Sequence, residues 1–378
     1  MIPQPLIALD IGSTKVACAI GLPHEHAPGF ELLGTSLVPY PALSEVWLGD
    51  PLLVSRTIEQ SLEATAVQAE MDRALVTVSH PALASERARV AVTLGDEPVP
   101  VRAQDLERLN ASALHQVLGV DRDPLVVERL GCDGNGFAGV RDPRGLSATR
   151  LLGTVHVITM PIAARRTLIQ AVESAGLEVS RITYALPSVL ASLADETLRH
   201  QRAVVIDVGG LTTDLGLFVE GVLHDAQILP WGGMKLASAI ASELKVTMEQ
   251  GLTFSLEGTA CRKPAVRALV ERHWERLQPA IERLLQEGPR PDAVLVTGRG
   301  ALLDGFAEWV ERSAGIPTSV GRSARMTQTG DLARQVGVSA AIGLLELATR
   351  GDGRAMLRSA HLFNRLIDRT RTILTEYF

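Results

Sequence analysis

The chain has 378 residues and a mass of 40.5 kDa, which exceeds one typical hydrophobic core and predicts two or more domains. Hydrophobic residues make up 46% of the sequence and charged residues 21%, as in globular proteins with ample core material. The net charge of -6 gives no general attraction for nucleic acid or an anionic membrane. We therefore expect no nucleic-acid partner, and any membrane contact must be local.

Cysteine usage and hydropathy predict a cytoplasmic protein. Cys18, Cys132 and Cys261 are far apart and lack the spacing of a metal site or a disulfide framework, which favours buried thiols in a reducing compartment. The N-terminal sequence shows no basic segment followed by a long apolar stretch. No apolar run approaches the roughly 18 residues that a membrane span needs.

The first part of the chain alternates strand and helix signals. Short apolar runs at residues 6–12, 16–22 and 30–38 predict three strands, and apolar residues at helical spacing predict a helix over residues 51–69. Residues 74–160 carry strand and helix signals of their own around a loop-rich middle. We expect them to form a small inserted subdomain.

Residues 7–16, IALDIGSTKV, are an apolar strand that ends in a carboxylate, a glycine and several polar side chains. A hairpin turn of glycine and hydroxyl residues presents backbone N–H groups and hydroxyls to phosphate oxygens. An aspartate at the strand end can hold Mg²⁺ through water, and a lysine adds a point charge for a phosphate. The candidate residues are Asp10, Gly12, Ser13, Thr14 and Lys15. Ordinary turn chemistry explains a single such motif equally well.

The same pattern recurs at residues 203–221, AVVIDVGGLTTDLGLFVEG, which indicates an internal duplication. Two such hairpins that face each other across a cleft would clamp one triphosphate, with Mg²⁺ held through water by Asp10 and Asp207. The candidate residues of the second copy are Asp207, Gly209, Gly210, Thr212 and Thr213.

A third motif lies at residues 293–316, AVLVTGRGALLDGFAEWVERSAGI, where a buried strand leads through a glycine-containing turn into a helix. Gly298, Arg299 and Gly300 form the turn, which lets backbone approach a purine or ribose at a helix N-terminus. Alone, this would be an ordinary strand-to-helix loop. After the two hairpins, it completes a predicted nucleotide site.

In this order the three motifs resemble the first phosphate, second phosphate and adenosine motifs of the actin, sugar-kinase and heat-shock chaperone ATPase superfamily. Within it, the chain resembles the FtsA family of bacterial cell-division proteins over nearly its whole length. The stretches RDPRGLSATRLLGTVHVIT, RTLIQAVESAGLEVSRITYALPSVLASL and ILPWGGMKLASAIASEL carry this resemblance. It implies an α/β, two-lobed, actin-like (ribonuclease H-like) ATPase fold with an inserted 1C-type subdomain and a C-terminal amphipathic helix.

The resemblance also divides the chain into parts. The expected parts are lobe 1 (1A) at 1–73, 161–200 and about 338–350, subdomain 1C at 74–160, lobe 2 (2A) at 201–230 and 293–337, subdomain 2B at 231–292, a linker at 351–360, and a membrane-targeting helix at 361–378.

Several positions depart from the family pattern. Leu211 stands where a third glycine is usual, and residues 185–187 read Ala-Leu-Pro where active relatives have Glu-Pro, whose glutamate helps position the attacking water. TMEQGLTF lacks the lysine of the family's Glu-x-x-Lys, so Glu249 is the only candidate there, and Arg299 replaces a glycine. Without a general base, attack on the γ-phosphate should be slow. We expect ATP and Mg²⁺ to bind with slow or absent hydrolysis.

The final segment, HLFNRLIDRTRTILTEYF at 361–378, follows Gly351 and Gly353, which suggest a hinge. Its apolar residues recur at three- and four-residue spacing with arginines between them, the pattern of a helix that lies in a membrane interface. The expected membrane contacts are Leu362, Phe363, Leu366, Ile367, Ile373, Leu374, Tyr377, Arg365, Arg369 and Arg371. A helix that docks on its own domain would show the same pattern.

The resemblance implies a filament-forming membrane anchor for the tubulin-like FtsZ ring, peripheral on the inner face of the cell membrane at the division site. The FtsZ C-terminal peptide would dock on 2B, where Arg267, Arg272 and Arg276 could meet acidic residues or simply face solvent. Other divisome proteins would bind 1C, and protomers would self-associate into protofilaments. Two alternatives stay open: a PilM-like adaptor of type IV pilus assembly that binds a membrane-protein peptide through 1C, and a small-molecule kinase.

Overall fold

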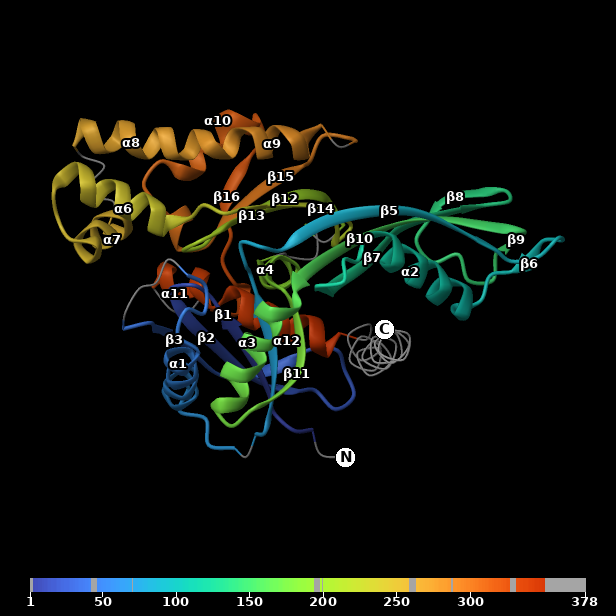
Figure 1. Ribbon diagram of the computed structural model, residues 1–378, viewed down its shortest axis with the longest axis horizontal. Coiled ribbons are helices and arrows are strands. Elements are labelled where there is room, and N and C mark those ends of the chain that lie inside the picture. Colours follow the sequence, from blue (N-terminus) through green and yellow to red (C-terminus); the bar gives the residue numbers. More distant parts are fainter. Residues whose placement is uncertain are drawn as a thin grey trace.

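The structure is a computed structural model that describes residues 3–41, 46–69, 71–193, 198, 200–257, 263–286, 288–326 and 331–350. Two of its sheets have five strands each and form the centres of two lobes, and a four-stranded sheet forms an arm to one side (Figure 1). Among the described residues, no helix is long and apolar enough to cross a bilayer.

The sheet of lobe 1 has the strand order β11-β4-β1-β2-β3. β1 pairs in parallel with β4 and antiparallel with β2, so the first motif forms a hairpin in the middle of this sheet. The strands are β1 (Leu6–Ile11), β2 (Lys15–Pro23), β3 (Phe30–Pro39), β4 (Arg73–Val78) and β11 (Glu178–Tyr184).

Helices cover both faces of this sheet because its strands are apolar on both sides. Ile7 and Leu9 share a core with α1 (Pro51–Ala64) and α3 (Ile162–Ser174), whereas Ala8 between them packs with α12 (Ser339–Thr349). Alternate residues of a strand point to opposite faces, which places these helices in two separate layers. α4 (Ala185–Leu193) packs against α12.

Helix α1 is shorter than the sequence predicts. Asp50 caps its N-terminus by accepting hydrogen bonds from the backbone N–H groups of Leu52 and Leu53, and Pro51 occupies the first turn. The helix ends at Ala64, because Ala66 adopts a left-handed conformation with a φ of 57° that no helix can continue. The predicted end at residue 69 is therefore wrong.

The arm is a four-stranded sheet with the order β5-β10-β7-β8, covered by one helix. β4 pairs with β1 and β11 in lobe 1, so the predicted start of the inserted subdomain at residue 74 is too early by the length of that strand. The glycine-rich middle, predicted as loop, contributes the end of β7 and all of β8, because pairing with β10 and β7 overrides the local turn signals. The elements are β5 (Ala84–Thr93), β6 (Val99–Pro100), α2 (Ala103–Val117), β7 (Arg122–Gly134), β8 (Phe137–Val140), β9 (Ser147–Ala148) and β10 (Arg150–Pro161).

The arm also contacts lobe 2. The buried His156 on β10 donates from Nδ1 to the carbonyl oxygen of Leu223 at 3.0 Å, and its Nε2 accepts from the Ser85 hydroxyl at 2.8 Å. Arg87 on β5 forms an ion pair with Asp225 at 3.4 Å. The inserted subdomain is thus joined to the lobe that does not contain its insertion point.

The sheet of lobe 2 has the order β14-β13-β12-β15-β16, with β12 and β13 forming the second hairpin. The elements of lobe 2 include β12 (Arg202–Val208), β13 (Thr213–Val219), β14 (Val222–Leu229), β15 (Ala293–Thr297), β16 (Thr318–Val320), the 3-10 turn η3 (Arg299–Leu302) and α10 (Phe306–Ala314). The 3-10 turn η4 (Ala324–Met326) and α11 (Leu332–Gly337) pack against lobe 1, where Met326 shares a core with Ala8 and Arg334 donates to the Thr35 carbonyl oxygen at 3.0 Å.

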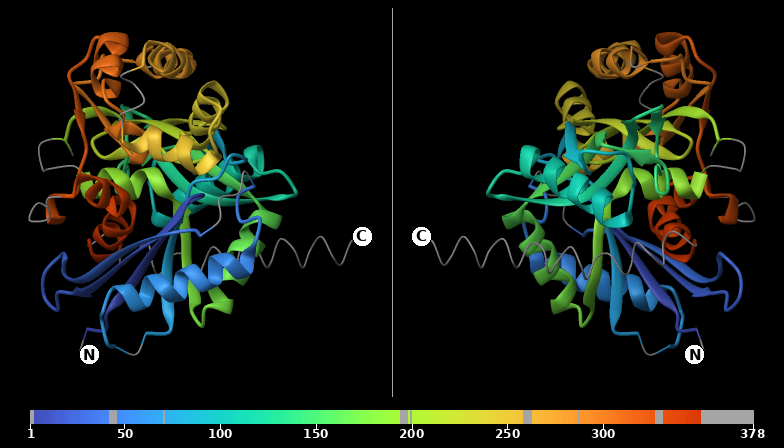
Figure 2. Two further views of the ribbon diagram at one scale, coloured as in Figure 1. Left: turned by 90° about the vertical axis from the view of Figure 1, so that its left-hand side faces the viewer. Right: turned by 90° about the vertical axis from the view of Figure 1, so that its right-hand side faces the viewer.

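The described part of residues 231–292 is mostly helical, with α8 and α9 along the top of lobe 2 in Figure 1 and a side view in Figure 2. α6 instead begins at the turn of the second hairpin, where the Gly233 N–H donates to the Gly209 carbonyl oxygen at 2.9 Å. Trp274 packs edge-on against Phe306 with ring centroids 5.5 Å apart, which anchors these helices on α10. The elements are α6 (Gly233–Leu244), α7 (Met248–Glu257), α8 (Pro264–Trp274), η2 (Glu275–Leu277) and α9 (Gln278–Leu285).

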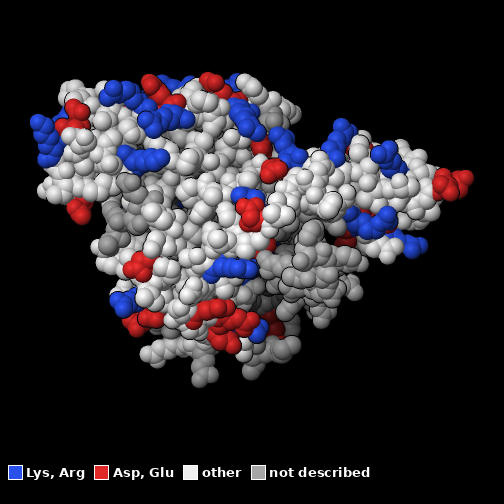
Figure 3. Space-filling view, viewed as in Figure 1, with Lys and Arg blue, Asp and Glu red and all other residues white. Residues whose placement is uncertain are grey.

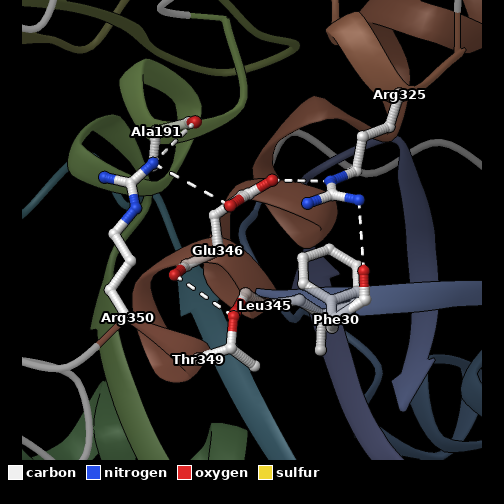
Figure 4. A network of polar contacts seen from close by, with 7 residues as sticks. All are labelled: Phe30, Ala191, Arg325, Leu345, Glu346, Thr349 and Arg350. Atoms are coloured by element: carbon white, nitrogen blue, oxygen red, sulfur yellow. Dashed lines mark hydrogen bonds and ion pairs between the residues drawn. The ribbon is translucent and has the colours of Figure 1, made fainter. Parts of the chain in front are cut away.

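The described chain ends at Arg350, where a polar network fixes α12 to lobe 1 (Figure 4). The carboxylate of Glu346 accepts from Arg325 at 2.6 Å and lies 3.9 Å from the Arg350 guanidinium. Arg325 also stands over the ring of Phe30 at 4.2 Å, and Arg350 donates to the carbonyl oxygen of Ala191 at 3.5 Å. Arg350, the residue before 351–378, is therefore fixed to lobe 1 by its contacts with Glu346 and Ala191.

Candidate functional site

The first hairpin places its carboxylate beside its lysine. Asp10 lies near the end of β1, and Lys15, the first residue of β2, forms an ion pair with it. Their side chains are only 13% and 12% exposed. The N–H of Gly12 donates to the Lys15 carbonyl oxygen at 3.1 Å and closes the turn. The lysine therefore neutralises Asp10 inside the turn.

The second hairpin brings two carboxylates together. Asp207 on β12 lies directly opposite Asp214 on β13, and opposed residues of an antiparallel pair project from the same face. The N–H of Gly209 donates to the carbonyl oxygen of Thr212 at 2.9 Å and closes this turn in the same way as the first. The hydroxyl of Thr213 is buried and has no hydrogen-bond partner.

Asp10 and Asp207 are electrostatically coupled, although they are 197 positions apart in the sequence. The pKa of Asp207 is raised to about 6, mainly by burial and also by the charge of Asp10, while the charge of Lys15 opposes both effects. Charges influence one another in this way only when they are close. The two strand-end carboxylates thus lie in one region between the lobes.

The tips of the two hairpins touch. The N–H of Leu211 donates to the Ser13 hydroxyl oxygen at 3.0 Å. A Cβ atom on Gly210 would lie 2.5 Å from Thr14 Cγ2 and 2.7 Å from Ser13 Oγ, so only glycine fits there. The sequence predicts turns that face each other across a cleft, whereas the structure places them in direct contact.

A buried polar cluster joins the lobes next to this contact. Ser79, the residue after β4, donates a hydrogen bond to Asp214, and its Oγ lies 2.8 Å from Thr212 Oγ1. Burial raises the pKa of Asp214 to about 7, and the hydrogen bond from Ser79 opposes this shift. Burial also raises the pKa of Tyr184, which lies beside Asp214. Neither Ser79 nor Asp214 is among the site residues predicted from the sequence. Their positions are a signal that could have found them, because Ser79 follows the end of β4 and Asp214 pairs with Asp207.

The third motif lies against the second hairpin. Gly298 has a φ of 80° and its backbone approaches the Asp207 carboxylate, while Gly300 packs against Val208. Arg299 is half-buried, which lowers its pKa, and Asp331 opposes that shift. α7 packs beside η3, so Glu249 in its first turn is near this motif, although its side chain is exposed.

These residues suit a nucleotide with Mg²⁺ by their chemistry. Mg²⁺ keeps most of its waters and takes one or two carboxylates, and Asp10 and Asp207 supply two. The buried hydroxyls of Thr213 and Thr297 lack hydrogen-bond partners in this region. Within the described residues, no group of three or more histidine, cysteine or acidic side chains could hold a metal ion by itself. The predicted membrane contacts at 361–378 lie outside the described residues.

Comparison with known proteins finds similarity to bacterial cell-division proteins. The family model of the SHS2 domain inserted in FtsA matches residues 81–159, which start just after β4 and cover the arm. The cell-division protein FtsA of Pseudomonas aeruginosa is 24% identical over 93% of this chain and 91% of its own length. FtsA of Rhizobium meliloti is 27% identical over 92% of this chain and 89% of its own length. These similarities support a divergent FtsA.

Solved structures confirm the fold. The chain of a PilM-PilN type IV pilus biogenesis complex superposes with a TM-score of 0.70 at 16% identity, covering 91% of this chain and 98% of that one. MreB 5 of Spiroplasma citri, bound to AMPPNP, gives a TM-score of 0.51 at 12% identity, covering 94% of this chain and 99% of that one. The chain therefore has the two-lobed actin-like ATPase fold that the resemblance predicts.

Proposed function

We propose that the chain is a membrane-attached adaptor of bacterial cell division that tethers FtsZ filaments to the inner face of the cell membrane. The observation that carries this proposal is the SHS2-type arm inserted after β4 of an actin-like fold, in a chain whose curated relatives are cell-division proteins. Such an adaptor needs a peptide-binding surface, a membrane contact and self-association.

The nucleotide site of this adaptor would lie where the hairpins meet. Asp10 and Asp207 would hold Mg²⁺ through water. The turns Gly12–Lys15 and 209–213 would bind phosphates through backbone N–H groups, and Gly298, Arg299, Gly300 and Glu249 would line the adenosine side. Bound Mg·ATP would neutralise the facing carboxylates and bridge the two lobes. Leu186, where active relatives have the water-positioning glutamate, is fully buried and offers no base, which supports slow or absent hydrolysis.

The helices α8 and α9 offer a surface for the acidic FtsZ C-terminal peptide. Arginine and lysine side chains gather over these helices, with acidic side chains between them (Figure 3). Arg267 is 71% exposed and paired with Glu271 at 3.2 Å, while Arg272 and Arg276 lie further along the same stretch. Exposed ion pairs of this kind are weak and can exchange partners with an incoming carboxylate.

Self-association is supported by the charge at the two ends of the molecule. Figure 3 shows acidic side chains at the base of lobe 1, opposite the basic helices of lobe 2. Glu63, Glu173 and Glu178 are exposed on the elements α1, α3 and β11 that form this base. Ends of opposite charge favour head-to-tail contacts between protomers.

A pilus-assembly adaptor is the second candidate, because the PilM chain has the same fold. At 16% identity that likeness reports the fold alone, whereas the similarity to FtsA extends over about nine-tenths of the sequence. The division role therefore takes precedence.

Co-sedimentation with vesicles tests the proposal. The full chain is mixed with vesicles of phosphatidylethanolamine and phosphatidylglycerol and with FtsZ from the same organism. We expect both proteins to pellet, and a chain that ends at residue 358 to leave both in the supernatant. If the full chain pellets with the vesicles but FtsZ stays in the supernatant, the result favours the pilus candidate. If the full chain does not bind vesicles, the result contradicts the membrane anchor.

A further inference from the structure

We propose that Ser13, Ser79, Leu186, Leu211, Thr212 and Asp214 form an interlobe clasp that holds the two lobes together without nucleotide. The inference rests on the nucleotide site proposed above and adds how that site is controlled. Two of these residues, Leu186 and Leu211, stand where the family pattern has a glutamate and a glycine, and the structure places both at the boundary between the lobes.

Leu211 extends the apolar core of lobe 1 into the second hairpin. Its side chain is 7% exposed and belongs to the same continuous core as Leu9 and Ile11 of β1. Its backbone N–H, which in a phosphate loop would face an oxygen of the ligand, donates instead to the Ser13 hydroxyl at 3.0 Å. A glycine at this position would supply the same N–H without the apolar contact.

Leu186 makes the complementary contact from lobe 1. It lies in the first turn of α4 and is fully buried, and a Cβ atom on Gly216 of β13 would overlap its Cδ2. The leucine therefore rests directly on the backbone of the second hairpin. Where a glutamate would bring a carboxylate and water to this place, the chain has a dry apolar contact.

Hydrogen bonds complete the clasp. Ser79 from lobe 1 donates to Asp214 of lobe 2, and its hydroxyl lies 2.8 Å from that of Thr212. All three residues are largely enclosed, so water competes weakly for these bonds. Together with the Ser13–Leu211 bond they connect both hairpin tips across the lobe boundary.

The clasp opposes nucleotide binding, because Thr14 and Gly210 are already in contact where phosphates would enter. Binding would first have to separate the hairpin tips, and the apparent affinity falls by the fraction of molecules that are open. The division-competent shape would then exist in the empty protein, and Mg·ATP would change it little.

Thermal unfolding and small-angle scattering, each with and without Mg·ATP, test the clasp in the full chain. We expect the wild type to show the same scattering profile in both conditions and only a small rise in melting temperature with Mg·ATP, because the clasp weakens binding. Leu211→Gly should melt lower without nucleotide, scatter as a more open particle, and gain a rise in melting temperature with Mg·ATP that reflects about tenfold or more tighter binding.

Leu177→Gly is the matched control. Leu177 is 4% exposed in the loop before β11, at the end of the sheet remote from the hairpins, so its loss should lower the melting temperature without creating a response to Mg·ATP. Should Leu211→Gly fail to fold, Ser79→Ala removes the hydrogen bonds to Thr212 and Asp214 and should open the protein in the same direction.

Two results would overturn the clasp. One is a wild type that changes its scattering and melting temperature with Mg·ATP as strongly as Leu211→Gly does. The other is that neither Leu211→Gly nor Ser79→Ala alters scattering or the response to Mg·ATP. Neither result touches the vesicle experiment, so failure of the clasp and failure of the division role are separately visible.

Discussion

Asp207 and Asp214 face each other on one hairpin, where Asp214 is buried and Asp207 is partly buried. Two carboxylates so close would repel each other if both were charged. The hydrogen bond from Ser79 favours the charged form of Asp214, and Lys15 favours the charged form of Asp207. The protonation states of Asp207 and Asp214 at the lobe boundary therefore change near neutral pH.

This balance predicts how pH changes stability through Asp214. Its pKa is raised from 3.8 to about 7 in the folded chain, so the folded state holds a proton there that the unfolded state has lost. That contribution stabilises the fold when the carboxyl is protonated and is lost as the pH rises toward and through 7. Asp214→Asn should remove the dependence.

The measurement is the free energy of unfolding in urea at pH 5 and pH 8. Between these values the wild type should lose roughly 2 to 3 kcal/mol relative to Asp214→Asn. Asp304→Asn, at an exposed carboxyl of lobe 2, is the control and should follow the wild type. Parallel curves for wild type and Asp214→Asn would refute the assigned burial of this group.

The local motifs of the site could be predicted from the sequence, but their contacts could not. Asp10 and Asp207 are recognisable because each hairpin is a continuous stretch with its own strand, carboxylate and glycine. Ser79 meets Thr212 across 133 positions, and no spacing rule connects them. The sequence marks Leu211 only as a departure from a usual glycine, and its packing into the core depends on residues of lobe 1 that are distant in the chain.

At the scale of elements, α12 holds lobe 1 together and carries the end of the described chain. Figure 4 shows Glu346 between Arg325 and Arg350, with Arg325 also over Phe30. The Glu346 side chain is 14% exposed, so its charge is poorly solvated and depends on these partners. The same helix packs on β1 and β2, directly beneath the first hairpin.

Removing this carboxylate should destabilise the chain measurably. Glu346→Ala leaves two partly buried guanidinium groups without it, and we expect a loss of about 1 to 3 kcal/mol in the free energy of unfolding. The exposed pair of Arg267 and Glu271 offers a matched control, because Glu271→Ala should cost no more than about 0.5 kcal/mol. Equal losses of unfolding free energy in the two variants would show that the network around Glu346 stabilises the fold no more than an exposed ion pair does.

Elements with clear periodicity were predictable, whereas those set by pairing were not. β1, β2 and β3 lie within one or two residues of the apolar runs that predict them. β8 forms from a glycine-rich stretch because it pairs with β7, and β4 joins the sheet of lobe 1 instead of the arm that follows it in sequence. Such choices depend on partners distant in the chain.

At the scale of the whole molecule, the arm touches both lobes and the two ends differ in charge. His156 and Arg87 link the arm to β14 of lobe 2, so the arm restrains how the lobes move. The acidic base of lobe 1 and the basic helices of lobe 2 lie at opposite ends (Figure 3). A head-to-tail assembly would bring these ends together.

This charge distribution predicts that self-association weakens with salt. Exposed charges are screened over about 8 Å at physiological ionic strength and over about 3 Å at 1 M. The amount of protein that pellets at high speed should therefore fall as NaCl is raised, and Glu173→Arg with Glu178→Arg should reduce it at low salt. Pelleting that increases with salt would indicate an apolar interface.

The account depends most on the direct contact between the hairpin tips of the two lobes. Ser79 Oγ and Thr212 Oγ1 are 2.8 Å apart, close enough for cysteines at these positions to form a disulfide. The double variant Ser79→Cys, Thr212→Cys is oxidised without nucleotide, digested and analysed by mass spectrometry without reduction. We predict a linked pair of peptides that contain residues 79 and 212, and a failure of these peptides to link would contradict the closed arrangement of the lobes.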